Sequence, residues 1–287
     1  MFFRSVARTF VLVLLVAAAT LLLMRFAPGY FSDAREMDAP YAESARAHLQ
    51  AEQRDGSLRA IAASTLGAWR HGSLGISRQY DVPVLTLIRP RLAVTAPLLL
   101  RGVLCGWFLA LCSALCAAHP SPAGRTGVSL LGAPFTVLLA VPTGAMATVC
   151  LLSGQGGPAL VLTLVLAARD FKFLHRVLRS AWNAPHVLHG RAQGLRGPQL
   201  VRVHVLPNVL PQMLALATLS LVTALSALVP VEVLFDVPGL GQLAWTAALN
   251  RDLPVLLAVT MLMACAVAFA GVLSQGVRSA RPRMETA

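Results

Sequence analysis

The sequence predicts an all-α, polytopic membrane protein with about six transmembrane helices. Of its 287 residues, 56% are hydrophobic and only 13% are charged, and its mean hydropathy is +0.69. Because soluble domains carry about 25% charged residues, this composition indicates that water is not the main solvent of the chain. Several apolar runs also reach or approach the roughly 20 residues that a helix needs to cross a bilayer core.

The charge distribution argues against a nucleic-acid partner. The formal net charge is +12, and all but one of the 24 basic residues are arginines that lie mainly between apolar runs. This placement is typical of membrane-flanking charges, and aromatic residues do not alternate with the basic ones as a single-strand binder requires. The cysteines fall inside apolar runs, where a thiol behaves as a small hydrophobe, and no metal site is predicted from them (Cys105, Cys112, Cys116, Cys150 and Cys265).

An N-terminal transmembrane helix is predicted within residues 1–24, followed by an extracytoplasmic segment, residues 25–92. The apolar run from Val6 to Met24 is long for a signal peptide and no small-residue cleavage site follows it, so we expect it to be retained. Arg4 precedes the run and Arg8 lies close to its start, which places the amino end in the cytoplasm. The segment 25–92 holds seven of the 12 acidic residues, and segments longer than about 60 residues translocate largely regardless of their charge.

Five further transmembrane helices are predicted within a core of residues 93–277, and a short basic tail, residues 278–287, follows in the cytoplasm. The third of the six spans contains Pro134 and Pro142, and membranes tolerate such kinks where neighbouring helices satisfy the freed carbonyls. The fourth span is the shortest because charges begin at Arg169, so we expect its helix to continue beyond the bilayer. The five apolar stretches cover about residues 93–118, 128–152, 158–168, 209–231 and 254–277.

The segment between the fourth and fifth spans, about residues 178–208, is predicted to be cytoplasmic. This segment and the end of the preceding helix carry Lys172 and five arginines, and no acidic residue follows Asp170 before the fifth span. An excess of basic residues in a short loop marks the cytoplasmic side. Asp170 itself, beside Arg169 and Lys172, is interpreted as part of a local ion pair at a helix end.

The sequence from Gly190 to Asn208 resembles the cytoplasmic loop of binding-protein-dependent ABC importer permeases. Gly194, Leu206 and Pro207 match the family's spacing of a glycine and a later apolar-x-Leu-Pro ending, while His204 stands where an aliphatic residue is usual. The family's initial Glu-Ala-Ala is absent, with Leu188-His189-Gly190 in its place. The stretch from Gly190 to Leu195 is similar to the Ala-Arg-Ala-Lys-Gly-Leu of the peptide and nickel branch.

Matches elsewhere in the chain resemble the same branch, and in particular the first of its two permease subunits, the dipeptide/oligopeptide type. Arg25-Phe26-Ala27-Pro28-Gly29 is similar to the motif that closes the first span, although Tyr30 replaces an acid. Similar motifs occur at the entrance to the second span and before the last span, at residues 72–77, 232–235, 238–241 and 251–255.

The resemblance implies a type I ABC importer permease (MetI-like) fold that forms half of a translocation pathway for peptides. Nickel or a metal chelate is the alternative cargo, and an ion-gradient-driven secondary transporter is the alternative class. The implied partners are a second, related permease, two ATP-binding subunits and an extracytoplasmic substrate-binding protein. ATP and Mg would bind to the ATP-binding subunits, because this chain has no Gly-x-x-x-x-Gly-Lys-Ser/Thr loop; we expect no cofactor and no enzymatic activity of its own.

Three sets of candidate site residues follow from the resemblance and the placement of polar residues. The ATPase-coupling loop comprises Gly190, Arg191, Ala192, Gly194, Leu195, Leu206 and Pro207, the alternative being a basic loop that only sets topology. A translocation path is predicted at Thr218, Ser220, Thr223 and Ser226, whose hydroxyls can instead bond to their own helix carbonyls. Contacts with a binding protein are predicted at Glu232, Asp236 and Gly239, and a solvated rim is the alternative.

Overall fold

The computed structural model describes residues 11, 15–20, 22, 67, 73–118, 122–195, 197–250 and 252–279. Most of the predicted N-terminal helix (1–24), most of the predicted extracytoplasmic segment (25–92) and nearly all of the tail (278–287) lie outside this range, as does the Arg25–Gly29 motif. Those assignments therefore stay predictions.

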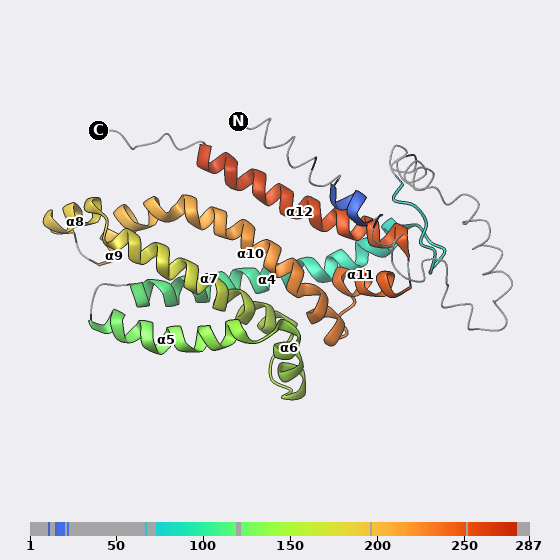
Figure 1. Ribbon diagram of the computed structural model, residues 1–287, viewed down its shortest axis with the longest axis horizontal. Coiled ribbons are helices and arrows are strands. Elements are labelled where there is room, and N and C mark those ends of the chain that lie inside the picture. The colour runs from blue at the N-terminus through green and yellow to red at the C-terminus, as the bar shows by residue number, and fades with distance from the viewer. Residues whose placement is uncertain are drawn as a thin grey trace. The chain divides into compact units, whose positions relative to one another are not determined.

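The described residues are helical and contain no strand, which confirms the predicted all-α class (Figure 1). The helices are α4 (Val84–Ala118), α5 (Pro122–Ala140), α6 (Thr143–Leu152), α7 (Pro158–Trp182), α8 (Pro185–Ala192), α9 (Pro198–Leu200), the π-helix η2 (Val201–Val205), α10 (Leu206–Leu234), α11 (Leu240–Leu249) and α12 (Leu253–Ser279). Helix α11 was not predicted; it lies in the stretch between the fifth and sixth spans.

Three helical stretches in the described part are long and apolar enough to cross a membrane, namely Val84–Ala118, Pro198–Leu234 and Leu253–Ser274. The predicted third span differs from the expected single kinked helix, because Gly132–Ala140 and Thr143–Leu152 are bent by 101° and together form one candidate span at most. Pro142 explains the break, since it has no N–H to donate and disfavours the helical conformation at Val141 before it. Helix α7 runs from Pro158 to Trp182 and so continues beyond its apolar part, which ends at Ala168, as we expected for the helix of the fourth span.

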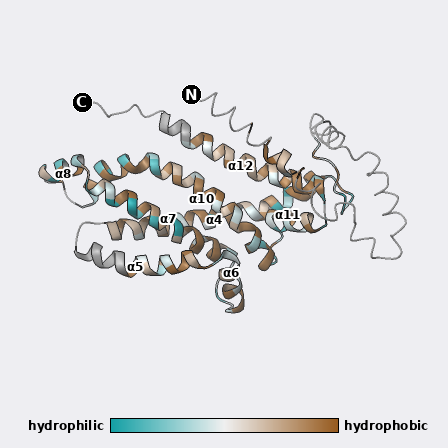
Figure 2. Cartoon of the chain, viewed as in Figure 1, coloured by the Kyte–Doolittle hydropathy of each residue, from teal (hydrophilic) through white to brown (hydrophobic). Residues whose placement is uncertain are grey.

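The described residues form two compact units, one of residues 73–95 and 237–268 and one of residues 96–236 and 269–279. In the second unit, α7 packs against α5 on one side and α10 on the other (Figure 1). The buried residues of α7 include Leu166, Phe171, Leu174 and Leu178. Figure 2 shows hydrophilic residues gathered on α8 and on the half of α7 nearest to it. The polar end of this unit is therefore the end that carries α8.

Helix α4 approaches α7 very closely at two glycines. A Cβ atom on Gly102 would lie 2.7 Å from Cβ of Leu162, and one on Gly106 would lie 2.9 Å from Cβ of Leu166 and 3.2 Å from the backbone oxygen of Thr163. The two glycines are four residues apart and so share a face of α4. This Gly-x-x-x-Gly arrangement lets two helix backbones approach each other in a membrane, where close van der Waals packing stabilises helix association.

In the first unit, Asp252 joins the loop before α4 to the start of α12. Its Oδ2 accepts hydrogen bonds from the Ser77 hydroxyl and, at 3.3 Å, from the Gln79 N–H. Its Oδ1 accepts a 3.4 Å bond from the Val255 N–H, in the first turn of α12. Because Ser77 and Asp252 are both buried, this polar contact fixes the path of the loop.

Candidate functional site

Helix α8 is a short helix with well-defined ends. Pro185 occupies its first turn, where a missing N–H costs nothing, and Ala184 before it has an extended conformation. At the other end, the Leu195 N–H donates to the Gly190 oxygen and the Gly194 N–H donates to the Arg191 oxygen, at 3.1 and 3.0 Å. This is the Schellman pattern, which requires a left-handed residue, and Gly194 supplies it with φ of +85°. Gly194 of the predicted coupling loop is therefore the C-terminal cap of α8.

Two residues hold α8 against the rest of the unit. Val187 is completely buried and belongs to the main apolar core. Gly190 is buried as well, and a Cβ atom on it would lie 2.9 Å from Cδ2 of His204 and 3.0 Å from Cδ1 of Leu200. The absence of a side chain at position 190 thus lets α8 lie directly on α9 and η2.

The remaining face of α8 is open to solvent. Leu188 is 55% exposed, and His189, Arg191 and Ala192 are also exposed. The Arg191 guanidinium lies 5.3 Å from the centre of the Trp182 ring, so its orientation is stabilised by a cation–π contact. A side chain added at Gly194 would meet no atom within 4 Å. The exposed face of α8 and its glycine turn together form a partly basic surface that includes the apolar side chain of Leu188.

The second half of the predicted coupling loop returns to the membrane through η2. A π-helix is rare and is frequently found at functional sites, and here it spans Val201–Val205 directly before α10. Leu206 packs against the main core and Leu195 does the same, whereas Pro207 is exposed in the first turn of α10. The seven predicted coupling residues therefore divide into buried or half-buried anchors (Gly190, Leu195 and Leu206) and exposed positions (Arg191, Ala192, Gly194 and Pro207).

The polar residues predicted to line a translocation path all lie on α10, and each hydroxyl approaches the carbonyl oxygen four residues earlier. The distances are 3.4, 3.0, 3.0 and 3.0 Å for Thr218, Ser220, Thr223 and Ser226, respectively. Ser220 is completely buried, and its hydroxyl also lies 2.7 Å from Oδ2 of Asp170 on α7. Ser226 is exposed and Thr223 is half-buried. The assignment of these residues to a path stays a prediction.

The three residues predicted to contact a binding protein differ in exposure. Glu232 is completely buried near the end of α10, and Asp236 is exposed in a turn with φ of +50°. Gly239 is buried at the start of α11, where its carbonyl oxygen accepts a 3.5 Å hydrogen bond from Arg91. Asp236 is therefore the residue of this set that an external partner reaches most readily.

Comparison with known proteins provides the decisive observation. Residues 102–280, more than half of the chain, match the family described as binding-protein-dependent transport system inner membrane component. The chain belongs to this permease family. The family's members are inner-membrane components of binding-protein-dependent transport systems, and this membership argues against the ion-gradient-driven alternative.

Similar curated proteins include both metal and peptide permeases. The permease is 34% identical over 107 residues to the metal-staphylopine import system permease protein CntB of Staphylococcus aureus (strain NCTC 8325 / PS 47), covering 37% of this chain and 34% of that protein. It is 26% identical over 215 residues to the dipeptide transport system permease protein DppB of Lactococcus lactis subsp. cremoris (strain MG1363), covering 67% of this chain and 69% of that protein. The match to CntB thus spans about a third of that relative's length.

Two polar features of the permease were not anticipated from its sequence. The expected ion pair at Asp170 is replaced by a buried contact with Ser220, while Arg169 donates a 3.3 Å hydrogen bond to the Leu219 oxygen. The helix packing at Gly102 and Gly106 was also missed, although their spacing is readable as a Gly-x-x-x-Gly motif. The contact between Gly190 and His204 has no comparable sequence signal, because it depends on how α8 folds back on η2.

Proposed function

We propose that this permease forms half of the translocation pathway of an ABC importer and that α8 transmits the work of ATP hydrolysis to it. The observation that carries this proposal is the form of α8: a capped helix, anchored by Val187 and Gly190, that presents an exposed face at the polar end of the unit. The family's import systems depend on a binding protein, and this chain has no Walker-type phosphate loop. A partner that binds ATP and Mg is therefore the source of the work.

The complete importer would contain this chain, a second and related permease, two ATP-binding subunits and an extracytoplasmic substrate-binding protein. In this arrangement the amino and carboxyl termini and α8 lie in the cytoplasm, because basic residues dominate those segments. Closure of the ATP-binding subunits would move α8 and the helices anchored to it, and so expose the pathway alternately to the two sides of the membrane. Asp236 lies on the opposite side, where it is available to the binding protein.

Peptides are the proposed cargo, and metal chelates are the second candidate. Similarity to a dipeptide permease over about two thirds of both chains supports peptides, and similarity to a metal-staphylopine permease over a shorter region supports chelates. Uptake of isotope-labelled dipeptides and of a labelled metal chelate by cells that express the complete system separates the two. Competition by unlabelled dipeptide but not by chelate supports the first cargo, and the reverse result supports the second.

The coupling role is tested by changing Gly194→Trp in the full complex. The new side chain projects into open space at the proposed docking face, so we expect the protein to insert normally while co-purification of the ATP-binding subunits and uptake are lost. Two controls isolate the cause. Gly194→Ala imposes the same left-handed backbone strain without the bulk. Gly154→Trp places the same bulk at another left-handed glycine with open surroundings, in the turn after α6.

Both controls should keep the ATP-binding subunits bound. Undiminished co-purification and uptake in Gly194→Trp would show that this face of α8 does not dock an ATPase. Loss of the ATP-binding subunits from Gly194→Ala as well would point to the fold of α8, and not to obstruction of its surface.

A further inference from the structure

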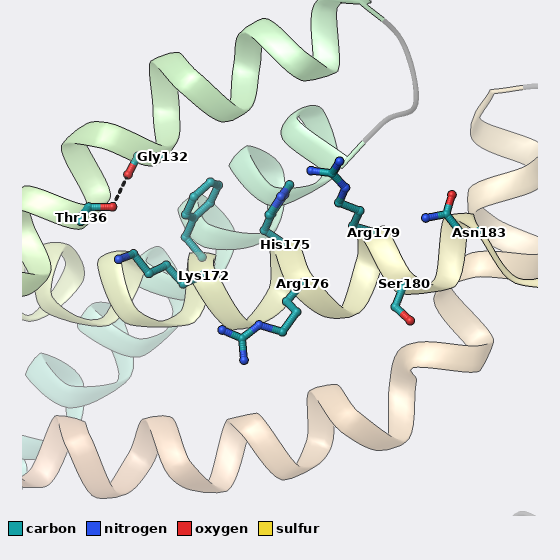
Figure 3. A pocket seen from close by; sticks show the side chains of 9 residues that line it. Gly132, Thr136, Lys172, His175, Arg176, Arg179, Ser180 and Asn183 are labelled. Carbon is teal, nitrogen blue, oxygen red and sulfur yellow. Dashed lines mark hydrogen bonds between the residues drawn. The ribbon is translucent and has the colours of Figure 1, made fainter.

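An open groove of about 570 Å³ lies between α5 and α7 in the second unit. One wall carries four basic side chains of α7, Lys172, His175, Arg176 and Arg179. His175 and Arg176 are neighbours in sequence, and each lies three or four residues from Lys172 and from Arg179. Figure 3 shows His175 and Arg179 extending from α7 toward α5, while Arg176 lies on the other side of the α7 ribbon in that view. Among the residues that the structure describes, no acidic one lines the groove.

The cations of the groove have no ionic partner within the described part of the chain. Lys172, Arg176 and Arg179 make no ion pair there, and the nearest acid along α7, Asp170, is buried against Ser220 of α10. The Nδ1 atom of His175 is buried and also lacks a hydrogen-bond partner among the described residues. The groove therefore concentrates positive charge and hydrogen-bond donors that nothing described in this chain neutralises.

The floor of the groove is aromatic, and the opposite wall, formed by Gly132 and Thr136 of α5, leaves room for a ligand. Phe171 is buried and stacks on Phe135 of α5 with ring centres 4.5 Å apart, and on His175 with centres 5.8 Å apart. Gly132 on α5 has no neighbouring atom within 4 Å of a Cβ placed on it. The volume is in the range of small-ligand sites, about 300–1,000 Å³.

The sequence prediction of a fourth span on α7 places the groove at the expected boundary of the membrane. The helix has 25 residues, which at 1.5 Å each gives a length of about 37 Å, longer than a hydrocarbon core of roughly 30 Å. The apolar half of the helix ends at Ala168, and the basic row begins four residues later. On α5, Leu130 and Val137 are 68% and 65% exposed, so this helix also carries an exposed apolar surface suited to acyl chains.

We propose that this groove binds the phosphate headgroup of an anionic membrane phospholipid, with Lys172 and Arg179 as the principal contacts. The simpler alternative is that these cations only face water. The aromatic floor and the facing helix α5 distinguish the groove from such a solvated helix face. Basic pockets between transmembrane helices at the cytoplasmic boundary are suited to acidic lipid headgroups, and each basic residue contributes about 1 kcal/mol to such binding. The described lining residues of the groove include no residue of α8.

The test is native mass spectrometry of the full-length permease complex in mild detergent, titrated with phosphatidylglycerol or phosphatidylcholine. We expect retention of phosphatidylglycerol and little of phosphatidylcholine. The contribution of each charge predicts that Arg179→Gln weakens retention about fivefold and that the triple variant Lys172→Gln/Arg176→Gln/Arg179→Gln weakens it about 100-fold. Arg89→Gln, an exposed arginine near the start of α4, is the matched control and should bind lipid as the unmodified protein does.

A second measurement does not depend on variants. Photoreactive phosphatidylglycerol should label peptides from α5 and from residues 171–183. An excess of unmodified phosphatidylglycerol should suppress that labelling. Equal lipid retention in the triple variant and the unmodified complex, or labelling only of other helices, would overturn the proposal. Displacement of the lipid by millimolar inorganic phosphate would also overturn it, because the groove would then be a site for a free anion.

Discussion

Gly190 on α8 and His204 in η2 fit against each other so closely that a Cβ atom on Gly190 would lie 2.9 Å from Cδ2 and 3.0 Å from Nε2 of the imidazole. The histidine stands where the family usually has an aliphatic residue. Its ring occupies the space that the missing side chain at position 190 leaves. The two halves of the coupling segment are therefore joined by a small residue and a large one, and α8 cannot shift independently of η2.

A large residue at position 190 should destabilise the coupling segment. Gly190→Leu forces the imidazole and Leu200 to move, and overpacking of this kind costs about 1–3 kcal/mol. The double variant Gly190→Leu/His204→Ala should recover part of that loss, because the ring is no longer in the way. Thermal unfolding of the solubilised protein measures both variants and each single change. Strictly additive effects would show that the two residues do not interact.

The helix pair α4 and α7 should be sensitive to any side chain at Gly102. A Cβ there would lie 2.7 Å from Cβ of Leu162, an atom next to the backbone that cannot rotate away, so Gly102→Ala must separate the helices at a cost of about 1–3 kcal/mol. Gly144→Ala on α6 is the control, because a Cβ at Gly144 meets nothing within 4 Å. The melting temperature should fall for the first variant only. Equal melting temperatures would contradict the close helix contact.

Features that depend on residues close together in the chain were predicted from the sequence, whereas contacts between residues far apart in the chain were not. The cores of α4, α10 and α12 were predicted because a long apolar run is a local signal, and Gly194 was assigned to the coupling loop because its spacing to Leu206 and Pro207 is local as well. The bend between α5 and α6 exceeds the expected kink at Pro142. Asp170 was assigned to neighbours in sequence, but its partner Ser220 is 50 residues away, and only the packing of α7 on α10 brings the two together.

The Asp170–Ser220 contact should show the energetic behaviour of a buried polar pair. Ser220→Ala removes the partner of Oδ2, and Oδ1 already has none among the described residues, so we expect a loss of about 1–3 kcal/mol. Asp170→Leu/Ser220→Ala replaces both polar groups with apolar ones and should be closer to the unmodified protein than Ser220→Ala is. Chemical unfolding in detergent micelles compares the two. A double variant less stable than Ser220→Ala would refute this explanation.

The contact of Asp252 with the loop before α4 should control the order of that loop. Asp252→Ala leaves the Ser77 hydroxyl without this partner in a buried site, which costs about 1–3 kcal/mol. It also removes the carboxylate that accepts a hydrogen bond from the Val255 N–H in the first turn of α12, a loss of about 0.5–2 kcal/mol. Asp252→Asn keeps an oxygen acceptor and should have a smaller effect, and Asp81→Asn, at an exposed position of the same loop, is the control. Hydrogen exchange of residues 73–83 should accelerate markedly in Asp252→Ala, moderately in Asp252→Asn and not at all in Asp81→Asn. The proposed topology places this loop on the side of the binding protein, so Asp252→Ala should also weaken binding-protein-stimulated ATPase activity. Unchanged exchange in Asp252→Ala would mean that other contacts hold the loop.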